Sequence, residues 1–275
     1  MASNPTGKEV LRASLGLFRQ DRHLVVLPLL AAVAALATLA AVGLPIVALL
    51  GATRIGIVVA LMVAGVLASS ATLFFNVALV FAATDRIEGR TPTVRGSLAQ
   101  AWGRRSTILK WALLAAVVST VVRALERRLG LLGRLVGFAG AVTWAVATFL
   151  VLPVLAFEDL GPVAALRRSS AIVKERFGTV TRSGLRFGLL FGVWLAAAMA
   201  VVAVGAMLVP ASVVFGGTLV AVGAFGVLAV AMYASAAGIY LRTILYRYST
   251  GLSVPELGVD LAAALESTRT PVFSS

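Results

Sequence analysis

The sequence predicts an all-α, polytopic membrane protein with six transmembrane helices arranged as three hairpins, each preceded by an amphipathic interfacial helix. Two observations carry this prediction. Apolar residues make up 60% of the 275 residues and charged residues only 13%, whereas about a quarter of the residues in a soluble domain are charged. The apolar residues also occur in long runs, and the mean hydropathy is +1.00.

Each expected span is an apolar run close to the roughly 20 residues that a helix needs to cross the hydrocarbon core. We expect spans at about 24–50, 55–83, 106–125, 135–157, 187–209 and 211–241. The first run is too long for the apolar region of a cleaved signal peptide, so we expect it to be retained. Residues 1–248 form one membrane domain in this interpretation, and 249–275 form a cytoplasmic tail that we expect to be poorly ordered.

The connections between spans differ in clarity. The first two spans are joined only by "GATR", which predicts a tight helical hairpin. The third span is the least clean, because Lys110 and Arg123 must snorkel at its two ends. The segment after it, "RALERRLGLLGR" at 123–134, has apolar residues at helical spacing and predicts an amphipathic extension at the outer interface. The alternative is that the third and fourth spans form a re-entrant pair.

The distribution of positive charge predicts the orientation. Six spans bring both termini to one side, and 19 of the 24 basic residues fall on that side. The other side holds the remaining five, which are Arg54, Arg123, Arg127, Arg128 and Arg134. Because cytoplasmic loops carry an excess of Lys and Arg, this ratio predicts an inner (plasma) membrane protein with a cytoplasmic N-terminus and C-terminus.

Three basic segments, at 10–22, 94–110 and 164–182, precede the three predicted hairpins. Each contains an Arg-x-Ser start followed by an aromatic residue, which is a thin but threefold internal pattern. Such segments attract anionic lipid headgroups, at about 1 kcal/mol for each well-placed basic residue. The net charge of +13 is thus accounted for by lipid, and we expect no binding of nucleic acid.

These segments supply the candidate headgroup contacts. On the predicted inner face the candidates are Arg167, Arg168, Lys174 and Arg176, and on the outer face they are Arg123, Arg127 and Arg128. With basic clusters at both faces, the protein could organise or move anionic lipid.

Inside the spans, polar and small residues predict packing. Asn76 is the polar intramembrane residue that costs most to bury, and we interpret it as bonding a neighbouring helix or lining a polar path. Gly184, Gly188 and Gly192 recur every four residues and predict a smooth helix-packing face. Glu158 closes the fourth span, where a carboxylate opposes the helix dipole, so we expect an ion pair with Arg167 or Arg168.

The sequence offers no catalytic, cofactor-binding or metal-binding motif. It has no Cys and a single His, His23, which excludes disulfides, thiolate metal sites and HExxH zinc sites. Neither a phosphate-binding glycine loop ending in Gly-Lys-Ser/Thr nor a Gly-x-Ser-x-Gly elbow occurs. We therefore expect a protein that is not an enzyme and carries no cofactor.

Three stretches carry a family resemblance. "FFNVALVFAATDRIEGRTPTV" (74–94), "WAVATFLVLPVLAFEDLGPVAALRRSSAIVKERFG" (144–178) and "LYRYSTG" (245–251) resemble a domain-of-unknown-function family of bacterial and archaeal six-helix membrane proteins. The second stretch is more loosely similar to the membrane domain of some glycerophosphodiester phosphodiesterases. The resemblance implies a membrane fold and no activity, since the phosphodiesterase catalytic domain has no counterpart in the sequence.

Three functions stay open at this point. The first is the organisation or movement of anionic lipid. The second is a channel or transporter for a small solute, with a polar path through Asn76, Thr143 and Thr148. The third is a structural role, in which the inner helices dock another protein or a second copy of the chain.

Overall fold

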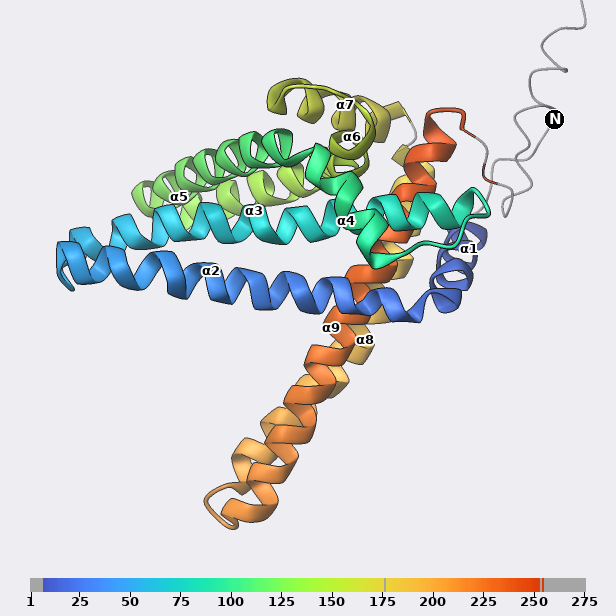
Figure 1. Cartoon of the computed structure of the whole chain (residues 1–275). Helices are drawn as coiled ribbons and strands as arrows, with labels where there is room; N and C mark the ends of the chain where they lie inside the picture. Colours follow the sequence, from blue (N-terminus) through green and yellow to red (C-terminus); the bar gives the residue numbers. More distant parts are fainter. Residues whose placement is uncertain (1–6, 176, 253, 255–275) are drawn as a thin grey trace, which may run out of the picture.

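The computed structural model describes residues 7–175, 177–252 and 254, and the side chains of these residues except 7–11, 22, 125–136 and 177–182. The chain is all-α (Figure 1). Its elements are α1 (Gly7–Gln20), the short 3-10 helix η1 (Arg22–Val25), α2 (Val26–Leu50), α3 (Arg54–Ile87), α4 (Val94–Gly103), α5 (Arg105–Ala147), α6 (Val151–Phe157), α7 (Pro162–Glu175), α8 (Phe177–Leu208) and α9 (Val213–Ser249).

Six helical segments are long and apolar enough to cross a membrane. They are His23–Leu50, Arg54–Ile87, Arg105–Ala124, Gly137–Phe157, Ser183–Leu208 and Val213–Ser249. All six correspond to the predicted spans, and the largest difference in bounds is at the last one, which continues to Ser249 beyond the predicted end at 241. The expected tail from 249 lies almost entirely outside the described residues.

The link between α2 and α3 is as short as the sequence predicts, and α2 packs along α3. Gly51 takes a positive φ of 75°, which a residue with a side chain rarely adopts. Thr53 then caps α3, because its hydroxyl accepts a hydrogen bond from the Gly56 backbone nitrogen at 3.1 Å. A glycine turn and a threonine cap are therefore enough to reverse the chain.

Helix α5 contains the third span and most of the fourth. Its backbone is helical from Arg105 to Ala147, yet the rings of Trp111 and Trp144 stack with their centroids 6.0 Å apart. A straight helix would separate these residues by about 50 Å. The segment therefore folds back on itself between the two tryptophans, as the two green limbs of Figure 1 show.

The predicted fourth span is interrupted by a turn. α5 ends at Ala147 and the chain continues through turn residues 148–150 into α6. Pro153 favours such a break, because it has no N–H to donate and fits best in the first turn of a helix. Pro153 occupies that position in α6, which begins at Val151.

Close packing between α8 and α9 depends on glycines other than those predicted. A methyl group on Gly205 would lie 2.6 Å from the Val220 backbone nitrogen, and one on Gly223 would lie 2.7 Å from that of Val202. Gly216 is equally tight against Val209. These three glycines let the two backbones approach.

The predicted packing stripe lies outside the contact between α8 and α9. Gly188 and Gly192 are exposed, and a methyl group on either would meet nothing within 4 Å. Gly184 makes only an ordinary contact of 3.7 Å with the Phe149 ring. Spacing by four recurs on several faces of a glycine-rich helix, and the partner helix decides which of those faces is used.

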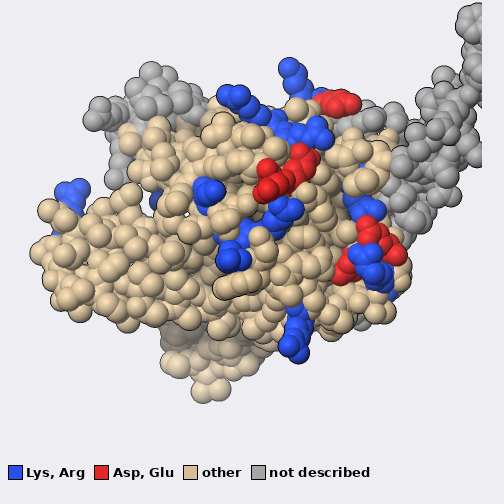
Figure 2. All heavy atoms as spheres, turned by 45° about the horizontal axis from the view of Figure 1, so that its top comes forward, with Lys and Arg blue, Asp and Glu red and all other residues tan. Residues whose placement is uncertain are grey.

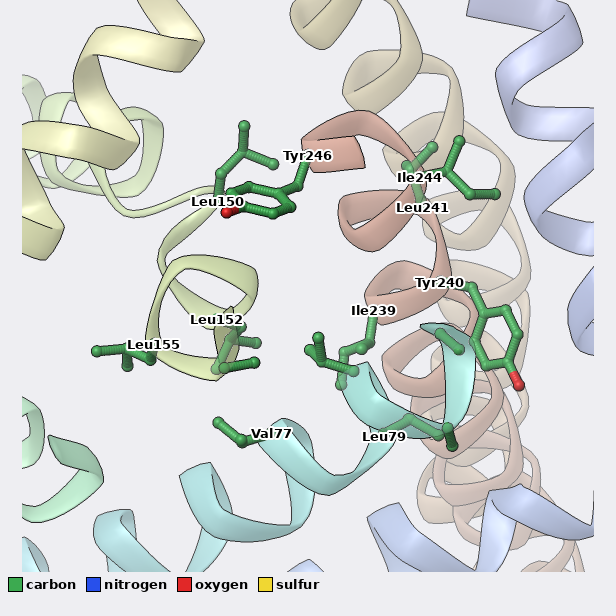
Figure 3. Close-up of a cluster of buried hydrophobic side chains, with 14 of the residues drawn as sticks. Val77, Leu79, Leu150, Leu152, Leu155, Ile239, Tyr240, Leu241, Ile244 and Tyr246 are labelled. Atoms are coloured by element: carbon green, nitrogen blue, oxygen red, sulfur yellow. The ribbon is translucent and has the colours of Figure 1, made fainter. Parts of the chain in front are cut away.

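The buried core lies where the ends of α3 and α9 meet α6. Figure 3 shows Val77 of α3, Leu152 of α6 and Ile239 of α9 around one space, with Leu79 and Leu155 farther out on the same helices, and all five are buried. Beyond this core the long helices expose apolar side chains, such as Leu49 at 83% and Val214 at 81%. In Figure 1, α8 and α9 diverge from α2 and α3 as they leave the core.

Gly216→Ala should destabilise the protein, because the new methyl group must displace the backbone of α8. Overpacking of this kind costs about 1–3 kcal/mol. Gly192→Ala is the matched control, since its methyl group meets open space. Thermal unfolding in detergent, followed by fluorescence-detected size exclusion, should show a lower midpoint for Gly216→Ala only. Equal midpoints for the two variants would show that the α8–α9 approach is not tight.

Candidate functional site

Charged side chains gather at one end of the helices, which we call the charged end. It comprises α1, the C-terminal ends of α3 and α9, helices α4, α6 and α7, and the start of α5. Figure 2 shows Lys and Arg there beside Asp and Glu, next to a long surface without charge. Among described basic side chains, Arg54 and Arg123 lie far from this end, at the start of α3 and well along α5.

A buried carboxylate, Asp21, ties three parts of the chain together. Asp21 precedes η1 but does not cap it, and its side chain is fully buried. Arg86 at the end of α3 donates to both carboxylate oxygens, with a distance of 2.7 Å from its Nε. The Tyr240 hydroxyl of α9 donates to the same carboxylate at 3.0 Å. The charge is thus satisfied by a bidentate guanidinium and a hydroxyl.

A second cluster joins α3 to the end of α9. Arg247 donates to Glu88 at 2.8 Å, and Arg90 lies 2.5 Å from the other oxygen of Glu88. Arg90 also donates from its Nε to Asp85 at 3.0 Å. Burial raises the pKa of Glu88, but the hydrogen bonds from Arg247 and Arg90 outweigh it, and the pKa lies below its ordinary value. These arginines offset the unfavourable position of two acids near a helix C-terminus.

Glu158 joins α6 to α7 and α9. It follows the last residue of α6 and receives Arg168 Nε at 3.1 and 3.2 Å on its two oxygens. Tyr246 of α9 donates its hydroxyl to Glu158 at 2.9 Å. The sequence suggests Arg167 or Arg168 as the partner of Glu158, and in the structure Arg168 forms this ion pair. The neighbouring Asp159 pairs with Arg104 at 3.3 Å but is 90% exposed, so this pair contributes little.

The predicted headgroup candidates divide into three groups. Arg167, Arg168 and Lys174 are exposed on α7, and Arg168 is held by Glu158. Arg123 is exposed on α5, far from the charged end. Arg127, Arg128 and Arg176 lie outside the residues whose side chains the structure describes.

A family model matches residues 54–254, which includes every helix from α3 to α9. The chain belongs to the DUF6159 family. The family is described as one of unknown function, in agreement with the resemblance seen in the sequence. No curated protein and no solved structure matches the chain, and the looser similarity to glycerophosphodiester phosphodiesterases is not shown.

The DUF6159 match covers the residues predicted for a solute path, but their contacts are local. The hydroxyls of Thr143 and Thr148 donate to carbonyls of their own helix, those of Ala139 and Trp144, at 2.8 Å each. Asn76 is half-buried and makes no side-chain hydrogen bond with another residue that the structure describes. The predicted bond to a neighbouring helix is therefore not present among those residues.

Metal chemistry gains no support from the described part of this DUF6159 chain. No three His, Cys, Asp or Glu side chains in that part come together to hold a metal ion. The carboxylates of the charged end form ion pairs and hydrogen bonds with arginines and tyrosines instead.

Two features of the site were not found from the sequence. The first is Asp21, although an acid within a basic segment before a span is a signal of an ion pair. The second is Arg242, on α9. Its guanidinium lies 5.2 Å from the centroid of the Phe149 ring, in the turn between α5 and α6.

Asp21→Asn should destabilise the protein by about 3–5 kcal/mol, because it leaves the Arg86 charge without its partner at a largely buried site. Asp159→Asn removes an exposed carboxylate and should change stability by less than about 1 kcal/mol. Thermal unfolding of both variants in the same detergent measures the difference. The double variant Asp21→Asn/Arg86→Gln should recover part of the loss, and additive losses would contradict the pairing.

Acidification should weaken the α3–α9 connection through Glu88. Because the pKa of Glu88 is lowered in the folded protein, its contribution is complete above the ordinary glutamate pKa of about 4.3 and is lost as the pH falls through the folded value. Thermal unfolding between neutral pH and about pH 2, which passes below the lowered pKa, should therefore show a smaller decrease for Glu88→Gln than for the unmodified protein. Parallel curves would exclude Glu88 as a contributor.

Proposed function

We propose that the chain is a multi-pass protein of the inner (plasma) membrane, with both termini in the cytoplasm, and that its charged end binds and organises anionic lipid. The proposal assigns the chain no reaction and no cofactor. The observation that carries it is the exposed basic face of α7, located at the end of the molecule from which the long apolar helices extend.

The orientation is supported by the separation of charge along the helices. All described basic side chains except Arg54, Arg123 and Arg186 belong to the charged end. A bias of this size is typical of the cytoplasmic side of a membrane protein. Trp102 of α4 adds to this support, because it is 62% exposed and Arg105 lies 5.3 Å over its ring. Exposed tryptophan beside arginine is typical of the headgroup level.

The six apolar segments then form three transmembrane hairpins, each preceded by a short helix at the interface. α1 precedes the α2–α3 pair, α4 precedes α5, and α7 precedes the α8–α9 pair. The α8–α9 pair extends far from the core, and the most apolar window of α8 has no buried residue. Lipid tails are the natural cover for such a surface.

Helix α7 supports lipid binding in particular because its two faces differ. Ala165, Ser169 and Ile172 are buried, and the Ser169 hydroxyl accepts a hydrogen bond from the Leu150 nitrogen at 3.2 Å. Arg167 and Lys174 are exposed and lie two turns apart on one face. α7 is therefore anchored by one side and presents two cations with the other.

The double variant Arg167→Gln/Lys174→Gln should weaken binding of anionic lipid roughly 30-fold, from about 1 kcal/mol for each basic residue. The protein is reconstituted in nanodiscs that contain both phosphatidylglycerol and phosphatidylcholine. Mass spectrometry then measures the ratio of the two lipids that remain bound to the purified protein. Both residues lack a carboxylate partner among the described side chains, so the fold should be unaffected.

Arg54→Gln/Arg123→Gln is the matched control, since it removes the same charge from positions far from the charged end. The expected result is a normal phosphatidylglycerol content for this control and a reduced one for the α7 variant. Equal lipid content in the two variants would reject α7 as the binding surface.

A further inference from the structure

Arg242 is a partly buried cation with no carboxylate partner among the described side chains. It lies on α9 between the buried residues Leu241 and Thr243, with its guanidinium against the Phe149 ring. Three carboxylates of the charged end are already paired with other arginines, since Asp21 receives Arg86, Glu88 receives Arg247, and Glu158 receives Arg168. No ion pair or hydrogen bond joins the Arg242 side chain to another described residue.

The ring alone does not satisfy this guanidinium. A cation–π contact returns only a small part of the hydration that a guanidinium loses on burial. Five N–H donors also need acceptors, and an aromatic face offers none in the plane of the guanidinium. An arginine in such surroundings can bind an anion that comes from outside the chain.

The register of α8 and α9 brings a second polar group to this position. Phe187 lies against Gly238 and Gly205 against Val220, so each step back along α8 is matched by one step forward along α9. Continuing that register for one turn from Phe187 and Gly238 sets Ser183 opposite Arg242. The same neighbourhood follows from Phe149, whose ring contacts Arg242 and lies 3.7 Å from a methyl group built on Gly184.

Ser183 is itself without a partner. The residue is fully buried, and its hydroxyl oxygen has no hydrogen bond among the described residues. Helical serine usually bonds a carbonyl one turn back, as Ser70 and Thr72 do in α3. Ser249 is also unpartnered, but it lies about 10 Å farther along α9 and is too distant to share a small ligand.

We propose that Arg242 and Ser183 bind a phosphate group against the Phe149 ring. A planar guanidinium fork and a hydroxyl donor together fit the tetrahedral oxygens of a phosphate mono- or diester. Arg242 lies about 10 Å from the end of α9, near the depth at which lipid phosphates meet the hydrocarbon. The group can come from a phospholipid headgroup or from inorganic phosphate.

This site goes beyond the exposed face of α7. Binding at α7 depends on surface charge and is weakened by salt. At Arg242 the phosphate would lie between α9, α8 and the turn between α5 and α6 and would also accept from the buried Ser183 hydroxyl, so the site should hold one phosphate per chain and persist in high salt.

The test is native mass spectrometry of the full-length protein titrated with phosphatidylglycerol in high salt. The unmodified protein should retain one lipid. Arg242→Gln should lose about tenfold to a hundredfold in affinity, and Ser183→Ala a smaller factor. Arg242→Lys keeps the charge without the fork and should fall between them. Arg186→Gln, an exposed arginine three residues from Ser183, is the matched control and should bind normally.

Inorganic phosphate is the second probe and identifies the source of the group. If phosphatidylglycerol stays bound in excess phosphate, the ligand is a lipid; if phosphate alone stabilises the protein against heat and does so less for Ser183→Ala, the ligand is free phosphate. Equal binding of both probes by the unmodified protein, Ser183→Ala and Arg242→Lys overturns the site, even when Arg242→Gln fails to fold. Loss of binding only in Arg167→Gln/Lys174→Gln would instead support α7 and reject Arg242.

Discussion

The fold depends on satisfying one buried carboxylate. Asp21 has no contact with water, so its charge is tolerable only because Arg86 and Tyr240 both donate to it. These partners come from the ends of α3 and α9, while Asp21 follows α1. One charge therefore determines where α1 lies and which ends of the long helices meet. The phenol ring of Tyr240 also packs edge-to-face on Phe18 of α1, with centroids 5.3 Å apart, so polar and apolar contacts support the same junction.

This junction holds the helices together at the charged end only and does not connect their far ends. Glu88 with Arg247 and Glu158 with Tyr246 repeat the arrangement, each joining α9 to another element at the charged end. Away from that end, the α8–α9 pair extends on its own (Figure 1) and its cohesion comes from glycine-mediated contact between two backbones. In a bilayer such a pair needs no protein cover, because lipid tails are as apolar as its side chains.

The spans could be predicted from the sequence because hydropathy is local information. The run at 24–50 has to be buried in lipid or protein whatever its neighbours are. Hydropathy does not reveal the turn at 148–150, because the apolar run continues through it. Pro153 is the local feature that favours a break in the helix. The choice between Gly188 and Gly205 as packing positions could not be predicted either, since both belong to similar patterns and the register with α9 decides between them.

Two arginines of α9 show why residue type alone does not identify a site. Arg242 and Arg247 are five residues apart and therefore point to different sides of the helix. Arg247 forms an ion pair with Glu88, whereas Arg242 lies over the Phe149 ring and, by the register of the helix pair, opposite the unpartnered Ser183. The Arg247 charge is neutralised within the fold. The Arg242 guanidinium keeps donors without an acceptor among the described residues, and because a cation that loses hydration favours a counter-charge, the proposal of an external anion rests on the same physics that pairs Asp21 with Arg86.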